Sequence, residues 1–456
     1  MRSSTAAPRS NASRSTGSLL GFTSFLLFLM PVVASLGSVV SVFGLAAARP
    51  LAAVLVVATI AVAPRLSRVS LWIVILIVCW LVWGLVTLHD MDALKRLFSI
   101  ALSLASLLAF VLYPWTRERL RLLGRAWLFA WFVAVIPAIY EIASGNHLPN
   151  YLSSSPDWVR ASSDDVASYF VNPNPFAYFL CASMAIFVMS SALEERRLRN
   201  VMLTCCAISP VIIYPTNGRL ALAVSLVFLL WMVATREVVR PYLRQLTAVT
   251  VAFAVAVAMV LICSPAVMSR ILESFEGSGS ERLRLYLNAI WMFLSTYGAG
   301  IGSGMFEKTI QSRQVPYTTS EAVNPHSGVF EILSQYGFLI AALVGAALIA
   351  VAWRGMRGIG RIDEAPEYRM IRQGVVITAI MIPVLSFGDS TFLDSPIAWI
   401  QVATLLGFYC AYRQIARPVP KWARDGDPEV PERFRVVRRT LAADRRDDEP
   451  VAVPAG

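Results

Sequence analysis

Apolar segments of about 20 residues recur along the whole chain, and they limit its fold more than any other feature. A helix of that length can cross a hydrocarbon layer roughly 30 Å thick. Hydrophobic residues make up 57% of the sequence and charged residues 15%, whereas soluble domains contain about 25% charged residues. The sequence therefore predicts an all-α, polytopic membrane protein.

We predict about twelve membrane-spanning helices from these segments. They lie near residues 19–41, 45–63, 70–88, 97–113, 124–143, 175–193, 199–215, 218–235, 245–264, 327–353, 373–390 and 396–413. The first is expected to be a retained helix, because no small-residue cleavage motif follows it. We expect three parts: a cytoplasmic segment 1–18, a transmembrane domain 19–413, and a disordered basic cytoplasmic tail 414–456.

The basic residues predict the orientation of the chain. Most of the 40 Lys and Arg residues fall in alternate loops and in the two terminal segments. Loops rich in Lys and Arg stay in the cytoplasm, so both termini are expected there, in the cytoplasmic (inner) membrane of a bacterium. The net charge of +11 is then explained by topology and by anionic membrane lipids. Binding to nucleic acid is not expected, because the chain has no basic soluble domain.

Two loops on the predicted extracytoplasmic side, about 144–174 and 265–326, are too long for simple hairpins. The second contains residues 281–298, whose apolar and aromatic content predicts a helix at the membrane interface. The motif GAGIGSG at residues 298–304 follows this helix. Its glycines either let backbone amides approach a phosphate or form a tight turn after the helix.

Several arginines lie on the predicted extracytoplasmic side, against the general bias in charge. Arg219 opens a span, and Arg282 and Arg284 lie in the predicted interfacial helix. Each is either an interfacial residue in contact with headgroups or a ligand for a phosphate or diphosphate, which guanidinium groups bind through paired hydrogen bonds. Arg282 and Arg284 are about 200° apart around a helix, so both cannot point into one site.

His326 stands directly before a long apolar run in the stretch NPHSGVFEIL. Such a histidine either caps or packs the helix, or removes a proton from a hydroxyl group as a general base. Glu331 lies inside the apolar run, where an ionisable side chain is expected to pair with an arginine or to be functional. Asp389 and Asp394 fit the roles of turn and cap residues. No ligand spacing among the His and Cys residues predicts a metal site or another cofactor.

Five segments, taken in order, resemble the superfamily of O-antigen ligases and Wzy-type polysaccharide polymerases. They are YEIASGNHLP (140–149), VNPNPFAYFL (171–180), NGRLALAV (217–224), ERLRLYLNAI…YGAGIGSGMF (281–306) and NPHSGVFEILSQYGFL (324–339). The resemblance covers about residues 140–410. The last segment is more similar to teichuronic-acid and exopolysaccharide polymerases than to lipid A-core ligases.

This resemblance implies a GT-C-like membrane glycosyltransferase that uses no metal and no nucleotide sugar. Its donor would be a glycan linked to undecaprenyl diphosphate, used on the extracytoplasmic face. The matching histidine is His326, expected to act on the acceptor hydroxyl, and the matching diphosphate ligands are Arg219 and Arg282. Supporting roles are expected for Glu331, Arg284, Asn324, Tyr286 and Asn174. Family members often carry Trp in place of Tyr286 and Asn in place of Ser327. These differences affect the expected contacts with the substrate more than the expected class of reaction.

The resemblance favours a polymerase, which joins lipid-linked repeats of a surface polysaccharide with inversion at the anomeric carbon. A ligase, which transfers finished glycan to lipid A-core or another acceptor, shares this chemistry. A flippase for lipid-linked oligosaccharides is a second alternative, although the charges lie mostly on one face. A non-catalytic component of an export complex is a third. The expected partners are the lipid-linked donor, a glycan acceptor, membrane lipids, a flippase and a chain-length regulator.

Overall fold

The computed structural model describes residues 11–37, 39–42, 45–63, 66–148, 165–170, 172–234, 278–319, 323–357, 366–388 and 392–415. The chain divides into two units, Met1–Tyr412 and Arg413–Gly456, and every contact discussed below lies in the first. The predicted span 245–264 and the predicted tail beyond residue 415 lie outside the described residues.

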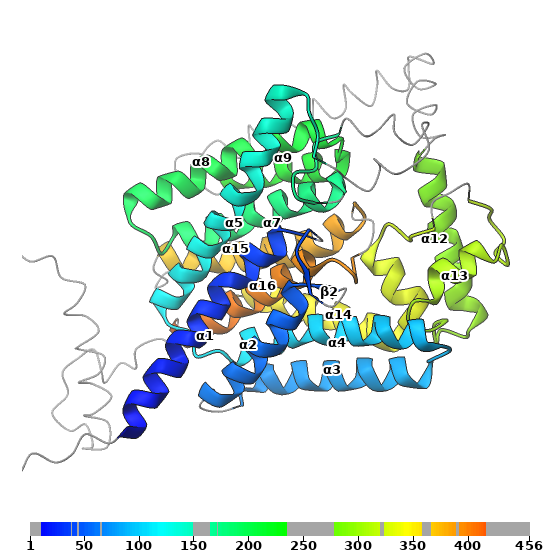
Figure 1. Cartoon of the computed structure of the whole chain (residues 1–456), viewed down its shortest axis with the longest axis horizontal. Coiled ribbons are helices and arrows are strands. Elements are labelled where there is room, and N and C mark those ends of the chain that lie inside the picture. The colour runs from blue at the N-terminus through cyan, green and yellow to red at the C-terminus, as the bar shows by residue number, and fades with distance from the viewer. Residues whose placement is uncertain are drawn as a thin grey trace, which may run out of the picture. The chain divides into compact units, whose positions relative to one another are not determined.

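Eight of the described helices are long and apolar enough to cross a membrane (Figure 1). They are α1 (Asn11–Ser35), α3 (Arg68–Val86), α4 (Met91–Leu112), α5 (Arg117–Ser144), α7 (Pro173–Ser191), α8 (Arg196–Ile213), α14 (Gly328–Met356) and α15 (Pro366–Ser386). Three shorter apolar helices are α2 (Ala48–Val62), α9 (Arg219–Ala234) and α16 (Pro396–Ile415). The all-α polytopic class is thus confirmed. Every predicted span except 245–264 coincides with a described helix, and the number twelve stays a prediction.

The remaining described elements are short or lie between these helices. They are the hairpin of β1 (Ser41–Val42) and β2 (Leu45–Ala46), the 3-10 helix η2 (Tyr214–Thr216), α12 (Ser278–Ser295) and α13 (Met305–Gln311). In the antiparallel hairpin, Ser41 pairs with Ala46 and Val42 with Leu45.

Helix α7 forms the core of the described bundle, with buried residues along almost its whole length and α5, α8, α9 and α15 around it. Trp127 of α5 stacks on Phe179 of α7, with ring centroids 5.9 Å apart. The buried indole N–H of Trp127 donates to Thr404 Oγ1 at 3.1 Å, and that of Trp131 donates to Ser209 Oγ at 3.1 Å. These bonds matter because a buried N–H without a partner is costly in an apolar interior.

Helices α12 and α13, with the glycine-rich segment 298–304 between them, form a small lobe beside α14, here called the α12–α13 lobe (Figure 1). Its core contains Leu285, Ala289 and Met292 of α12 together with Phe306 and Ile310 of α13. The spacing of the three α12 residues places them on one face of the helix. The predicted helix at 281–298 is therefore present as α12.

Helix α14 is interrupted at Gly337, whose backbone lies at φ 72° and ψ −170°. Residues with positive φ cannot continue a right-handed helix, so helical hydrogen bonds are lost around this point. The carbonyl groups of Ser334 and Gln335 instead accept from the amides of Ile301 and Gly302, at 2.8 and 3.0 Å. The glycine-rich segment thus satisfies polar backbone groups that the break exposes, as a membrane-embedded helix requires.

Candidate functional site

His326 sits in an unusual backbone conformation at the start of α14. Its φ is +47°, in the left-handed region that few residues other than glycine adopt. The next residue, Ser327, is the N-cap of α14, and its hydroxyl accepts from the amide of Phe330 at 3.5 Å. The turn at His326 therefore directs the chain into α14 and holds the imidazole at the mouth of the helix.

The imidazole of His326 is half-buried, and its Nδ1 has no hydrogen-bond partner among the described residues. Burial, together with the positive charge of Arg282, lowers the pKa of His326 to about 4. Both effects disfavour the imidazolium form. The ring is therefore neutral at physiological pH and able to accept a proton.

Arg282 approaches His326 from the first turns of α12. Its side chain is half-buried, and it forms no ion pair with any described residue. Its positive charge acts on both His326 and Tyr286, which places all three groups close together. A partly desolvated guanidinium without a carboxylate partner is suited to bind an external anion.

Tyr286 lies one helical turn after Arg282 and belongs to a cluster of three aromatic rings. It stacks on Phe330 of α14 with centroids 4.6 Å apart, and Phe387 at the end of α15 meets both rings edge-on at 5.9 and 6.0 Å. The hydroxyl of Tyr286 donates to the carbonyl oxygen of His326 at 3.4 Å. This cluster packs α12 against α14 next to the His326 backbone.

Arg219 is the first residue of α9, and its side chain is exposed. The adjacent Leu220 lies against Gly388, where a Cβ would meet the leucine side chain at 3.4 Å. Gly388 follows Phe387, the residue that contacts Tyr286. Phe387 and Gly388 thus connect the aromatic cluster with the start of α9. Arg219 therefore lies at the same end of the bundle as Arg282 and His326.

The other predicted site residues occupy different positions. Arg284 is exposed and donates to the carbonyl oxygen of Thr318 at 3.2 Å, within the α12–α13 lobe. Asn324 is half-buried, and its Oδ1 has no partner in the described part of the chain. Asn174 lies in the first turn of α7, and its amide donates to Asn172 Oδ1 at 2.9 Å. Of these three residues, Asn324 is the nearest to His326 in sequence, two positions before it.

Glu331 is buried and supports the helix ends around the site. Its Oε2 accepts from the amide of Leu393, at 3.1 Å, in the turn before α16. The negative charge of Glu331 acts on Arg96 of α4, and an arginine that pairs with Glu331 stays a prediction. Arg96 also forms ion pairs with Glu307 of α13 and with Asp394, the latter at 3.4 Å. These charges connect the α12–α13 lobe to the bundle.

The glycine-rich segment forms a docked turn and does not expose its amides. The amides of Gly298, Gly300, Ile301, Gly302 and Gly304 all donate to groups within the protein, namely Phe293 O, Thr296 Oγ1, Ser334 O, Gln335 O and Gln335 Oε1. They are not available to bind a phosphate. Of the two interpretations, the tight turn is therefore the correct one.

Sequence reasoning missed two features of the site. Phe387 is part of the aromatic cluster, but it follows the end of α15 and no local sequence pattern marks it. Arg96 and its carboxylate partners were also missed, because Arg96 directly precedes a predicted span and looked like a loop residue. The sequence marks Arg96 as a charged residue next to an apolar segment, and a charged side chain in that position is expected to have a defined partner.

The chain matches known proteins in two comparisons. Residues 202–345, which include Arg219, Arg282 and His326, match the family model described as O-antigen ligase. The chain is also similar to the teichuronic acid biosynthesis protein TuaE of Bacillus subtilis (strain 168), with 24% identity over 359 residues, 75% of this chain and 72% of the relative.

The apolar helices and these similarities define a multi-pass membrane protein of polysaccharide biosynthesis, with a polymerase- or ligase-type function. Together they support the assignment of the chain to the superfamily of O-antigen ligases and Wzy-type polymerases.

Proposed function

We propose that the protein is a glycosyltransferase that polymerises the repeat units of a surface polysaccharide of the exopolysaccharide or O-antigen type. The donor is a glycan on undecaprenyl diphosphate, and the acceptor is a hydroxyl group of a second lipid-linked repeat. The reaction takes place on the extracytoplasmic face of a bacterial cytoplasmic membrane. Both termini then lie in the cytoplasm, and a flippase and a chain-length regulator act beside the enzyme.

In this reaction the acceptor oxygen attacks the anomeric carbon, and the bond between that carbon and the diphosphate breaks. The proton of the hydroxyl moves to the neutral imidazole of His326. Arg282 and Arg219 bind the carrier diphosphate, whose negative charge increases as it leaves. Attack from the side opposite the diphosphate inverts the anomeric centre.

One observation carries this proposal: a neutral imidazole lies beside a guanidinium that has no carboxylate partner in the described chain. A capping histidine would not need an uncompensated positive charge next to it, since that charge disfavours its protonation. Glycosyl transfer needs both a base for the acceptor hydroxyl and a cation for the anionic leaving group, and the imidazole and the guanidinium fit these two roles.

The ligase alternative rests on the family match to O-antigen ligase. It differs only in the acceptor, so the glycans of cells that lack the protein separate the two functions. Single repeats on the carrier indicate a polymerase, and full-length chains that stay on the carrier indicate a ligase. If the protein is a flippase, cells that lack it should keep lipid-linked repeats on the cytoplasmic face of the membrane.

The mechanism is tested with purified protein and the lipid-linked repeat that accumulates in those cells. We expect His326→Asn to lower the rate of transfer by about 10²–10⁴-fold, the usual contribution of a general base. We expect Arg282→Gln to lower it by about 10²–10³-fold, as for other residues that stabilise a leaving charge. Arg284→Gln is the matched control, because Arg284 lies on the same helix but is exposed. Normal polymer from either of the first two variants would refute this mechanism.

A further inference from the structure

The carboxylate of Glu141, near the end of α5, is buried and holds the described ends of the predicted loop 144–174. Its Oε1 accepts from the amide of Leu148 at 2.8 Å, and its Oε2 accepts from the amides of Ala167 and Ser168 at 3.1 and 3.0 Å. Hydrogen bonds from three amides compensate a buried negative charge that would otherwise be costly. One side chain of a membrane-spanning helix thus fixes both ends of this loop.

The second of these ends contacts the turn that leads into α9. The amide of Val166 donates to the carbonyl oxygen of Pro215 at 3.1 Å, and Asp165 Oδ1 accepts from the side-chain amide of Asn217 at 2.5 Å. Asn217 has a left-handed backbone, with φ of +53°, and its carbonyl oxygen accepts from the amide of Arg219 at 2.9 Å. The loop therefore restrains the stretch of backbone from which the Arg219 side chain extends.

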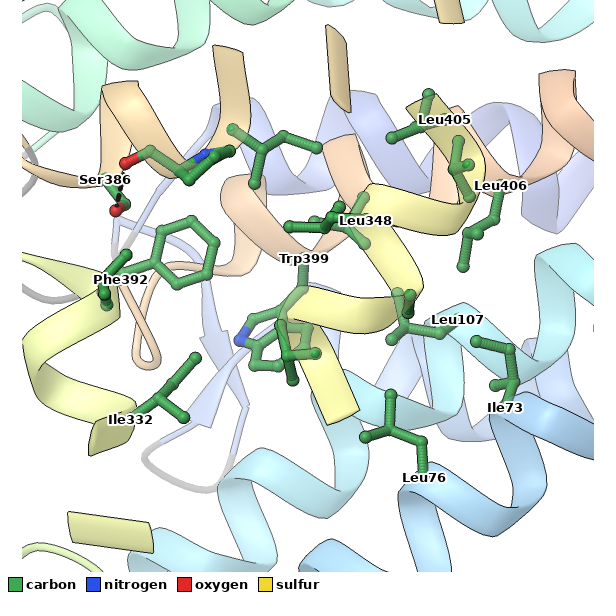
Figure 2. Close-up of a pocket in the computed structure, with 18 of the residues that line it drawn as sticks. Ile73, Leu76, Leu107, Ile332, Leu348, Ser386, Phe392, Trp399, Leu405 and Leu406 are labelled. Carbon is green, nitrogen blue, oxygen red and sulfur yellow. Dashed lines mark hydrogen bonds between the residues drawn. The ribbon is translucent and has the colours of Figure 1, made fainter. Parts of the chain in front are cut away.

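An apolar pocket borders the site at the start of α14. It is lined by Gly328, two residues after His326, and by Phe392 and Ser386, which lie close together in Figure 2. No charged side chain is among its lining residues, so an anion next to His326 finds no partner on this side. The pocket offers no substitute for the proposed diphosphate ligands on α9 and α12, and the position of Arg219 becomes important.

We propose that the loop end positions Arg219 for the reaction, with Asp165 as the positioning residue and Glu141 as the anchor of the loop. The inference rests on the proposed function, in which Arg219 binds the departing diphosphate. The Arg219 side chain is exposed, so the place of its guanidinium depends on the backbone at the start of α9. Displacement of such a group by about 1 Å can lower a rate by about 10²-fold. Asp165 acts through its hydrogen bond to Asn217 and not through its charge.

Variants of this hydrogen bond test the inference in transfer assays with the lipid-linked repeat. We expect Asp165→Ala to lower kcat about tenfold, with the KM for the donor changed less than about twofold. Asp165→Asn keeps an acceptor oxygen and should retain most of the activity. Asn217→Gly removes the same bond but allows the left-handed backbone, so it should match Asp165→Ala, and the double variant should be no slower than either. Ser144→Ala is the matched control, because its hydrogen bonds lie at the other end of the loop, within residues 140–146.

Arg219→Gln shows whether the effect of Asp165 passes through the guanidinium. In this background Asp165→Ala should lower kcat less than about twofold, because the group to be positioned is gone. An equal loss in both backgrounds would mean that Asp165 only stabilises the fold, and the inference would be wrong. Asp165→Asn as slow as Asp165→Ala would assign the effect to charge, which also refutes it. Normal transfer by Arg219→Gln, or no transfer by the wild-type protein, would instead refute the proposed function and the inference with it.

Discussion

Gly300 and Gly298 provide a quantitative test of how the α12–α13 lobe docks on α14. Both residues have a left-handed backbone, with φ of +85° and +83°. Replacement of either by Ala therefore costs about 1–2 kcal/mol for the conformation alone. Any difference between the two variants must come from what the added methyl group meets.

The surroundings of the two residues differ. A Cβ at Gly300 would lie 2.6 Å from the backbone nitrogen of Gly337 and 2.7 Å from the carbonyl of Gln335. At Gly298 it would meet only the ring of Phe293, at 3.3 Å. Overpacking against fixed backbone costs about 1–3 kcal/mol. The added methyl group would also push the glycine-rich segment away from the break in α14. This movement would strain the hydrogen bonds from the amides of Ile301 and Gly302 to α14, each of which contributes about 1 kcal/mol.

We therefore expect Gly300→Ala to destabilise the protein by about 3–5 kcal/mol and Gly298→Ala by about 1–2 kcal/mol. Thermal unfolding of the purified variants in one detergent measures the order of the two effects. Gly300→Ala should also lower the rate of glycosyl transfer in protein that remains folded, because the docked segment sets the position of Arg282 relative to His326. Equal melting temperatures for the two variants would refute the described docking.

Three further predictions follow from the site. Since burial and the charge of Arg282 lower the pKa of His326 to about 4, the imidazole loses its role as a base only near that pH. The acid limb of kcat/KM should then have its midpoint near 4, and a midpoint near the ordinary 6.5 would contradict this environment. Tyr286→Phe keeps the stacked ring but removes the hydrogen bond to the His326 carbonyl, so kcat should fall a few-fold while the KM for donor and the melting temperature stay the same. Arg96→Gln removes the ion pair of the half-buried Glu307 and leaves Asp394 with Arg49 alone, so it should cost about 1–3 kcal/mol, whereas Lys95→Gln, in an exposed pair, should cost below about 1 kcal/mol in the same unfolding assay.

The membrane class and the positions of most spans could be predicted from sequence because they depend on local composition. A run of apolar residues must form a helix if it lies in lipid, whatever its neighbours are. Helix α12 was predictable for a related reason, since its apolar and aromatic residues recur at helical spacing. The separation of Arg282 and Arg284 onto different faces also follows from helical geometry alone.

The break in α14 could not be predicted in the same way. Gly337 lies within an apolar run that looks continuous, and its effect depends on a segment more than thirty residues earlier in the chain. The partners of the glycine-rich amides are likewise set by tertiary contacts. The role of Glu331 was only partly predictable: a buried carboxylate needs a partner, but its spacing from His326 does not reveal that the Leu393 amide donates to it.

The backbone at His326 has a consequence for how this protein can change during evolution. A φ of +47° is adopted mainly by Gly, Asn, Asp and His, and it is strained for β-branched side chains. Asn and Asp codons are each one nucleotide from a His codon, so a single mutation can remove the base without straining the turn. Inactive copies with Asn at this position should therefore remain folded and inserted in the membrane. Produced beside the active enzyme in one cell, such a protein should compete with it for the lipid-linked substrate and lower the yield of polymer.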